Sequence, residues 1–267
     1  MKNTIKKLEF FSTQLRKLIL ETSLNCGSPS HIGGALSIAD IMSVLYFKII
    51  KKTKIHNDRF ILSKGHGFLA LLSVLHLKGL INREDLLKFQ QNGSNFIAHP
   101  IANSKIGIES SNGSLGQGLS FGIGIAISYK KRRKKGKIFV LLGDGECYEG
   151  SVWEAAVSAS EHNLNNVCVI VDCNGFQNDG AIGSEMSEKN MHNKWRSFGW
   201  NVIRCNGHNL QSLLNAFQLN NFDKPTAIIA KTIKGKGVKF MENNNDWHHN
   251  RLTNSLYNEA IKNLNNA

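Results

Sequence analysis

The sequence lacks the features that mark secreted, disulfide-bonded and membrane-spanning proteins. Its five cysteines are odd in number and show no CxxC spacing, which argues against a disulfide framework and a zinc site. No run of 18 apolar residues occurs, so we expect no membrane span. The lysine-rich start, Met1 to Leu8, leads into an amphipathic pattern, so we expect no signal peptide. These absences predict a reduced, cytoplasmic protein without a membrane partner.

Acidic residues are scarce, because 20 Asp and Glu residues stand against 33 Lys and Arg, a net charge of +13. Much of the excess lies in two runs, Lys48 to Lys54 and Lys130 to Lys137. Such runs occur in nucleic-acid-binding patches, in solvated helix ends and loops, and in surfaces that dock acidic partners or steer phosphorylated substrates. The second run has no aromatic residue beyond the adjacent Tyr129, and no nucleic-acid-binding motif is present. We therefore favour a solvated surface and expect no nucleic-acid partner.

Apolar runs alternate with helical patterns along the 267 residues, of which 41% are hydrophobic, enough to bury one large core. The runs Lys137 to Leu142 and Val167 to Asp172 are continuously apolar, as interior parallel strands covered on both faces are. Further strands are expected over residues 59–62, 201–205 and 226–230. Strands separated by helices predict an α/β fold with a doubly wound, mainly parallel sheet flanked by helices. We expect a single domain over residues 1–267.

Helical spacing of apolar residues predicts the flanking elements. Helices are expected over residues 4–24, 37–50, 68–78, 82–90, 114–129, 152–162 and 252–264. Ser37 is expected to be the N-cap of the second of these helices. The helix over residues 114–129 carries little charge, so we expect it to be deeply buried.

Three strand ends carry polar residues and glycines, and in an open parallel sheet ligands bind beyond those ends. Gly143-Asp144-Gly145 follows one apolar strand, and Asn174-Gly175 follows the next. One carboxylate and one amide oxygen suit Mg²⁺ or Ca²⁺, which shares its coordination with substrate phosphates. Each stretch alone is more typical of a turn. Their combination at one βαβ spacing favours a metal–diphosphate site.

Glycines also cluster in Asn112-Gly113-Ser114-Leu115-Gly116-Gln117-Gly118, which opens a helix. Without side chains at these positions, the backbone can approach a ligand closely. A Rossmann fingerprint fails on spacing, because the glycine after Gly118 is Gly122, and no clear strand precedes the run. A P-loop is excluded, because no GxxxxGK[ST] sequence occurs.

Histidines form the last candidate group. His31, His66, His99 and His248 lie beside Gly, Pro or Trp in expected loops or helix starts, where imidazoles can donate to phosphates and sugar hydroxyls. Each one alone is equally typical of a surface or structural histidine. The other histidines we assign to that structural group: His56, His76, His162, His192, His208 and His249.

These motifs together resemble the thiamine-diphosphate-binding half of transketolases. The stretch GDGECYEGSVWEAAVSASEHNLNNVCVIVDCNGFQNDG, residues 143–180, is similar to the transketolase form of the thiamine diphosphate motif. Further matching stretches occur in family order: SHIGGALS (30–37), LSKGHG (62–67), AHP (98–100), GSLGQG (113–118) and KTIKGKGV (231–238). The resemblance covers about residues 10 to 250 and implies the thiamine-diphosphate-binding (PP-type) fold.

The resemblance implies a role for each matching residue. It implies that Asp144 and Asn174 bind Mg²⁺ through their side chains and Phe176 through its carbonyl oxygen, with Ca²⁺ or Mn²⁺ as possible substitutes. Thiamine diphosphate contacts are implied for His66, Gly113, Leu115, Gly145, Asn174 and His248. His31 and His99 would face the reacting ketose, and Glu149 would lie at the subunit contact between paired active sites.

The chain departs from full-length transketolases in two ways. It stops at Ala267, before the pyrimidine-binding and C-terminal domains, so the resemblance is to the N-terminal subunit of a split enzyme. That implies a separate C-terminal subunit, an α2β2 heterotetramer, and ketol transfer between ketose and aldose phosphates. It also has Ser28-Pro29-Ser30-His31 where many relatives have Ser-Gly-His. Alternatives are a non-catalytic cofactor-binding scaffold, a 1-deoxyxylulose-5-phosphate synthase fragment and a 2-oxo acid dehydrogenase E1 subunit.

Overall fold

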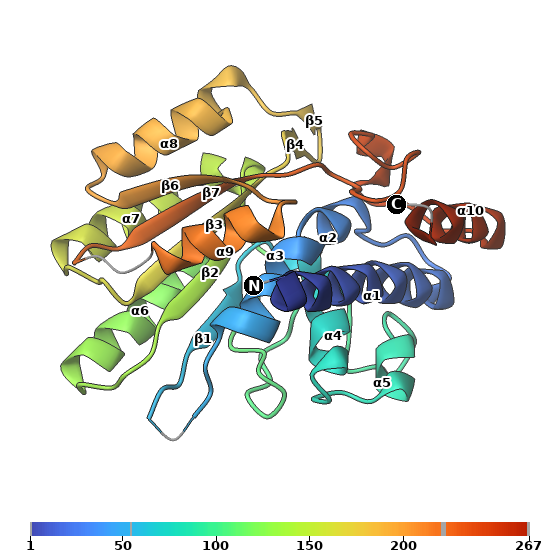
Figure 1. The fold of residues 1–267 in the computed structure, drawn as a ribbon, viewed down its shortest axis with the longest axis horizontal. Helices are drawn as coiled ribbons and strands as arrows, with labels where there is room; N and C mark the ends of the chain where they lie inside the picture. The colour runs from blue at the N-terminus through green and yellow to red at the C-terminus, as the bar shows by residue number, and fades with distance from the viewer. Residues whose placement is uncertain (1, 54, 220–222, 266–267) are drawn as a thin grey trace.

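In the part of the chain that the computed structural model describes, residues 2–53, 55–219 and 223–265, five parallel strands form a central sheet (Figure 1). The strand order is β1-β2-β3-β7-β6, and every neighbouring pair is parallel. The bounds are β1 Arg59–Leu62, β2 Ile138–Gly143, β3 Val167–Cys173, β6 Asn201–Asn206 and β7 Thr226–Lys231. A short hairpin follows β3 and consists of β4, Phe176–Gln177, and β5, Gly180–Ala181. The predicted doubly wound parallel sheet is confirmed.

The strands bury both faces of the sheet, because successive side chains point to opposite sides. In β2, Ile138, Val140 and Leu142 belong to one hydrophobic core, whereas Phe139 and Leu141 belong to the other. All five side chains are buried. The apolar run is continuous in sequence because both sides of the strand are covered.

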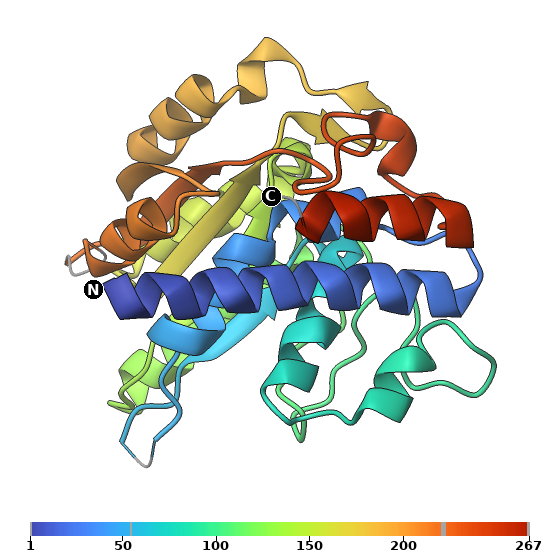
Figure 2. The ribbon, with the colours of Figure 1, turned by 45° about the vertical axis from the view of Figure 1, so that its right-hand side comes forward.

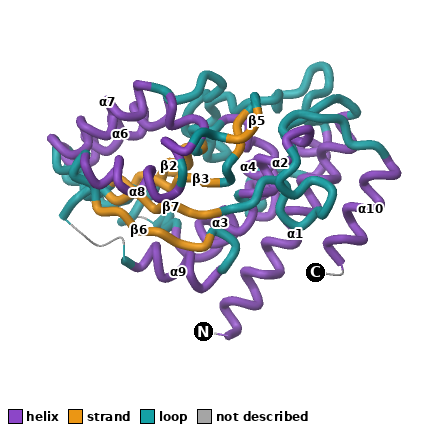
Figure 3. Tube along the Cα trace, turned by 90° about the horizontal axis from the view of Figure 1, so that it is seen from above, coloured by secondary structure: helices purple, strands orange, loops and turns teal. Residues whose placement is uncertain are grey.

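Helices cover the two faces of the sheet (Figures 1 and 3). One face packs against α1 (Lys2–Cys26), α2 (Gly33–Ser37), α3 (Ala39–Val44), α4 (Phe68–Leu77) and α9 (Leu210–Gln218). The other packs against α6 (Gln117–Lys131), α7 (Gly150–Glu161) and α8 (Glu188–Ser197). Farther from the sheet, α5 (Arg83–Leu87) and α10 (Asn254–Asn265) contact α1, and Figure 2 shows α10 running beside it. Among these described helices, none is long and apolar enough to cross a membrane.

The segment expected as one helix over residues 37–50 is interrupted. It divides into α2, α3 and a π-helical turn, Leu45–Ile49. The prediction that Ser37 caps this helix is wrong, because Ser37 is the buried last residue of α2. Its hydroxyl donates to the Asp172 carboxylate at 2.7 Å and contacts the Gly34 carbonyl oxygen at 3.0 Å. Ser37 therefore makes a tertiary contact with Asp172 instead of the helix cap that the local sequence predicts.

Two further expectations need correction. The helix predicted over residues 114–129 begins at Gln117, and it is not deeply buried all round, because Gln117, Ser120 and Phe121 are exposed.

Helices α8 and α9 were not predicted from the sequence. In α8 only two of ten residues are buried, Met191 and Trp195, so its apolar periodicity is weak. In α9 a signal was present, since the side chain of Asn209 caps the helix by accepting from the Ser212 N–H at 2.8 Å.

The loop after β1 packs at Gly65 against the glycine-rich loop, which consists of residues 112–118. A Cβ added to Gly65 would lie 2.0 Å from the Asn112 carbonyl oxygen. Because both groups belong to the backbone, we expect Gly65→Ala to lower the free energy of unfolding by about 1–3 kcal/mol or more. The control Gly124→Ala lies in α6, where an added Cβ meets nothing within 4 Å. It should raise stability by about 0.5–1 kcal/mol. Urea unfolding followed by circular dichroism measures both, and equal effects would contradict this packing.

Candidate functional site

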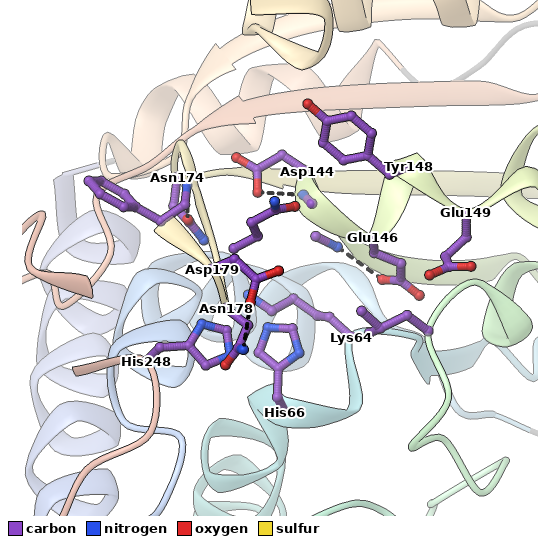
Figure 4. A pocket seen from close by; sticks show the side chains of 15 residues that line it. Lys64, His66, Asp144, Glu146, Tyr148, Glu149, Asn174, Asn178, Asp179 and His248 are labelled. Atoms are coloured by element: carbon purple, nitrogen blue, oxygen red, sulfur yellow. Dashed lines mark hydrogen bonds between the residues drawn. The ribbon is translucent and has the colours of Figure 1, made fainter. Parts of the chain in front are cut away.

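The three expected loops meet at one edge of the sheet and line a cavity of about 240 Å³ (Figure 4). The lining residues come from the loops after β1, β2 and β3, from the glycine-rich loop and from the segment before α10. They are Lys64, His66, Leu115, Gly143, Asp144, Gly145, Glu146, Tyr148, Glu149, Asn174, Phe176, Gln177, Asn178, Asp179 and His248. The placement follows from the register, which pairs Gly143 of β2 with Asp172 of β3 and so ends both strands at the same level.

Asp144 and Asn174 share this cavity. The Asp144 carboxylate is buried and accepts the Gly175 N–H at 2.6 Å and the Gly145 N–H at 2.9 Å. Because Gly175 directly follows Asn174, the two predicted ligands are held together by one hydrogen bond between their loops. The Asn174 side-chain oxygen accepts the Phe176 N–H at 3.0 Å, and Phe176 lines the same cavity. The structure thus brings the three expected metal ligands together.

The donor set fits a hard divalent cation. It offers one carboxylate, one amide oxygen and a main-chain carbonyl, which are the oxygen types that Mg²⁺ and Ca²⁺ prefer. Within residues 2–53, 55–219 and 223–265, no group of three or more His, Cys, Asp or Glu residues is arranged to hold a metal ion. The expected set contains only one residue of those types, Asp144, so it does not depend on such a group.

Burial, and after it the nearby Asp172 charge, raise the pKa of Asp144 to about 7. The backbone N–H groups of Gly175 and Gly145 act in the opposite direction, because they stabilise the ionised form. Without a cation, the carboxyl group is therefore only partly ionised near neutral pH. A cation beside it would favour the ionised form.

The buried carboxylate of Asp172 lies beneath the site and orients Asn174. One of its oxygens accepts from the Lys64 ammonium at 2.5 Å, the Ser37 hydroxyl at 2.7 Å and the Asn174 amide at 2.9 Å. Its other oxygen accepts the Thr232 hydroxyl. Burial alone would raise the pKa of Asp172, but Lys64 and these donors hold it below its ordinary value. Sequence inspection missed this network, because Asp172 reads as the end of an apolar strand.

A second buried carboxylate, Glu146, joins three segments on the other side of the cavity. One oxygen accepts the Ser63 hydroxyl at 2.5 Å and the Gly116 N–H at 2.9 Å, and the other accepts the Gly143 N–H at 3.1 Å. Burial raises the pKa of Glu146, although these three donors partly offset the shift. Gly116 has a positive φ of 80°, which glycine adopts without strain and which turns its N–H toward this carboxylate.

Four predicted histidines and one other form a cluster at the cavity. The His31 ring centroid lies 5.9 Å from that of His66, 5.4 Å from His99, 5.5 Å from His248 and 4.5 Å from His249. The His66 and His248 ring centroids are 5.4 Å apart, and the two rings lie beside each other in Figure 4. His249, which the sequence analysis assigned to the structural group, lies directly against His31.

The position of His249 follows from a backbone contact. Ser30 and Asn250 form an isolated antiparallel bridge, with N–H···O distances of 3.0 and 3.1 Å. The bridge brings the neighbours of these residues, His31 and His249, to the same place. Since the partners lie near opposite ends of the sequence, local pattern gives no indication of this pairing.

Four of the clustered histidines, His31, His66, His99 and His248, have lowered pKa values and are neutral at physiological pH. Burial, followed by the effect of His249, lowers the pKa of His31 to about 3. Burial and the nearby Lys234 lower the pKa of His248 to about 4, and burial lowers the pKa values of His66 and His99 as well. A neutral imidazole offers one donor and one acceptor, which suits hydroxyl groups and diphosphate oxygens.

Lys234 is a site residue that the sequence analysis quoted only as part of a motif. Its buried ammonium group lies 2.9 Å from the His248 Nδ1 atom and donates to the Asn245 side-chain oxygen at 2.7 Å. Burial, and after it the charge of Lys64, lower its pKa to about 8. The ammonium also lies 5.6 Å from the centre of the Phe176 ring.

The remaining predicted residues lie at the rim of the site. Leu115, Gly145 and Glu149 line the cavity, and Glu149 is exposed just before α7. Gly113 lies beside His99, since a Cβ on Gly113 would be 3.9 Å from the His99 Cβ atom. Their places agree with the predicted arrangement, whereas their roles remain predictions.

Comparison with known proteins identifies the family. The family described as transketolase, thiamine diphosphate binding domain, matches residues 12–265. The chain is 38% identical to a subunit of the apulose-4-phosphate transketolase of Phocaeicola vulgatus, over 97% of this chain and 94% of that protein. It is 35% identical to the 6-deoxy-6-sulfo-D-fructose transketolase subunit SqwG of a Clostridium species, over 96% of each. Among solved structures it resembles the transketolase of Campylobacter jejuni, with a TM-score of 0.87 and 30% identity.

The chain therefore belongs to the transketolase family and corresponds to its N-terminal, thiamine-diphosphate-binding part, so the predicted resemblance is confirmed. The similarity covers 97% of this chain but only 43% of the Campylobacter jejuni enzyme. By contrast, it covers nearly the whole length of both relatives that are named as subunits.

Removing Lys64 tests the buried ion pair. Both side chains of the Lys64–Asp172 pair are 0% exposed, so Lys64→Met leaves a buried charge without its counter-ion. We expect the free energy of unfolding to fall by about 3–5 kcal/mol. In the control Lys88→Met, which breaks an exposed pair with Glu84, the urea midpoint should not move. A small effect of Lys64→Met would mean that the neutral donors around Asp172 suffice.

The raised pKa of Asp144 predicts a pH dependence of stability in the ligand-free chain. Between its ordinary pKa of about 4 and the folded value of about 7, the unfolded chain has lost this proton and the folded chain retains it. The contribution of Asp144 is therefore present at low pH and is lost as the pH rises through about 7. Urea unfolding without divalent cations should show the stability of wild type, relative to Asp144→Asn, falling from pH 5 to pH 7.5. Identical pH profiles would contradict the assignment.

Proposed function

We propose that this chain binds thiamine diphosphate with Mg²⁺ and acts with a separate C-terminal subunit to transfer a two-carbon ketol unit from a ketose phosphate to an aldose phosphate. The observation that carries the proposal is that Asp144 and Asn174 line one cavity together with the glycine-rich loop and His66. The family match supports the cofactor, and the oxygen donor set supports the cation.

Different residues would bind the cation, the diphosphate and the aminopyrimidine of the cofactor. Asp144, Asn174 and the Phe176 carbonyl would hold Mg²⁺, and Gly145 would lie against the diphosphate. The His66 and His248 ring centroids are 5.4 Å apart, and both rings would donate to diphosphate oxygens. Gly113 and Leu115 would meet the aminopyrimidine side through the backbone.

The reaction divides between the cofactor and the histidines. When bound, thiamine diphosphate supplies the nucleophilic carbon that adds to a ketose carbonyl and allows the adjacent C–C bond to break. His31 and His99 lie 5.4 Å apart, and as neutral imidazoles they would donate to and accept from the hydroxyl groups of the donor sugar. Glu149, exposed before α7, would contact a neighbouring subunit.

The relatives that are named as transketolase subunits support the proposed subunit assembly. Both relatives named as transketolase subunits match this chain over 94–96% of their own length. We propose the same division here: one PP-type domain over residues 1–267, a partner that carries the pyrimidine-binding and C-terminal domains, and an α2β2 heterotetramer. We place the complex in the cytoplasm, with sugar phosphates as substrates.

A cofactor-binding scaffold without catalysis is the second candidate. The full set of Asp144, Asn174, His31, His66 and His99 favours an active site, because a scaffold has no need for histidines facing the substrate. Supplying the complex with a ketose phosphate or with pyruvate separates a transketolase from related thiamine diphosphate enzymes.

The decisive experiment reconstitutes the enzyme. The isolated chain should bind Mg²⁺–thiamine diphosphate weakly and show no turnover, whereas mixing it with the partner subunit should give ketol transfer. Asp144→Asn should weaken Mg²⁺-dependent cofactor binding by about 100-fold or more and remove activity, because the only predicted carboxylate ligand is lost. The control Asp179→Asn removes an exposed carboxylate from the same cavity and should have little effect.

Each of these measurements has an outcome that would contradict the proposal. Robust turnover by the isolated chain would refute the shared active site. Unchanged activity of Asp144→Asn in the reconstituted complex would favour the scaffold. A loss of binding as large in Asp179→Asn would point to the overall charge of the cavity instead of metal ligation.

A further inference from the structure

Two side chains of the loop after β7, Thr232 to Lys236, contact Asp172, beneath the candidate site, and His248, which lines it. The Thr232 hydroxyl donates to the buried Asp172 carboxylate, and the Lys234 ammonium lies 2.9 Å from His248. Ile233, between them, directs its N–H the other way, toward His208. The backbone position of this loop therefore determines where Thr232 and Lys234 lie.

His208 holds this loop from the side opposite the cavity. Its Nε2 atom accepts the Ile233 N–H at 2.8 Å, and its Nδ1 atom lies 2.8 Å from the Asp40 carboxylate. Because Nε2 accepts, the proton of the neutral ring is on Nδ1 and is donated to Asp40. The imidazole thus connects a main-chain N–H of the loop to a buried carboxylate on α3.

Asp40 is itself fixed by Arg16 of α1. The guanidinium donates to both carboxylate oxygens, at 3.0 and 2.6 Å, and both side chains are about 10% exposed or less. The Arg16 Nε atom also donates to the Lys236 carbonyl oxygen at 3.0 Å. Two main-chain atoms of the loop, the Ile233 nitrogen and the Lys236 oxygen, are therefore attached to one ion pair between helices.

We propose that His208 is a positioning residue for cofactor binding: supported by the Arg16–Asp40 pair, it fixes the backbone of the loop so that Thr232 and Lys234 keep their places at the site. This inference rests on the proposed function for its effect on the cofactor. The inference that His208 anchors the loop depends only on the contacts of His208 with Ile233 and Asp40.

The expected effect is local. Without the imidazole, the Ile233 N–H loses its acceptor in a partly buried place, and the loop gains freedom between Thr232 and Lys236. Asp40 keeps its contacts to Arg16, so the packing of α1 on α3 remains. Residues that act through others in this way typically alter affinity by about tenfold or more. The turnover number at saturating cofactor should change little, because no reacting group is removed.

The test compares three variants of the full chain. His208→Phe removes both ring nitrogens, whereas His208→Gln restores a neutral donor and acceptor on one side chain. His192→Phe, at a partly exposed position of α8, makes the same replacement away from the site. The measurements are hydrogen exchange of the amides of residues 233–236 in the ligand-free chain, and the Mg²⁺–thiamine diphosphate dissociation constant, kcat and KM of the complex with the partner subunit.

We expect His208→Phe to speed exchange of the loop amides and to weaken cofactor binding about tenfold, with kcat at saturating cofactor nearly unchanged. His208→Gln should recover most of both effects, and His192→Phe should match wild type. Unchanged loop exchange in His208→Phe, or faster exchange spread equally over the whole sheet, would overturn the inference. If the wild-type complex binds no cofactor, the proposed function fails, and the exchange comparison alone decides whether His208 anchors the loop.

Discussion

The site depends on the buried carboxylate of Asp172, which accepts hydrogen bonds from four parts of the chain. Ser37 comes from α2, Lys64 from the loop after β1, Asn174 from the loop after β3 and Thr232 from the loop after β7. A full negative charge at 0% exposure is tolerable only when such donors surround it. The charge therefore fixes the relative positions of the loops that shape the cavity, and it orients the Asn174 amide.

Burial has opposite consequences for the acids and bases around the cavity. It raises the pKa of Asp144 to about 7 and lowers that of Lys234 to about 8, because it penalises whichever form is charged. The histidines are held neutral for the same reason. A cation would favour the ionised form of Asp144, and a diphosphate would favour the charged form of Lys234. The electrostatics of the site therefore agree with the ligand that the family implies.

Much of the fold, and the meeting of Asp144 and Asn174 at one cavity, could be predicted, because both depend on local pattern. Apolar runs covered on both faces gave the parallel strands, and the polar residues directly after two of them gave Asp144 and Asn174. The pairing of Lys64 with Asp172, the role of Glu146 and the place of His249 could not be predicted. Each depends on a contact between distant segments, and neither periodicity nor spacing carries that information.

The bridge between Ser30 and Asn250 has a consequence for biosynthesis. It is the contact that brings His31 to His249, and residue 30 is made long before residue 250. Until residue 250 has left the ribosome, the first strands of the sheet can assemble, but the histidine cluster cannot close. In the cell, binding of the proposed cofactor should therefore follow synthesis of residues 1–250 instead of guiding it.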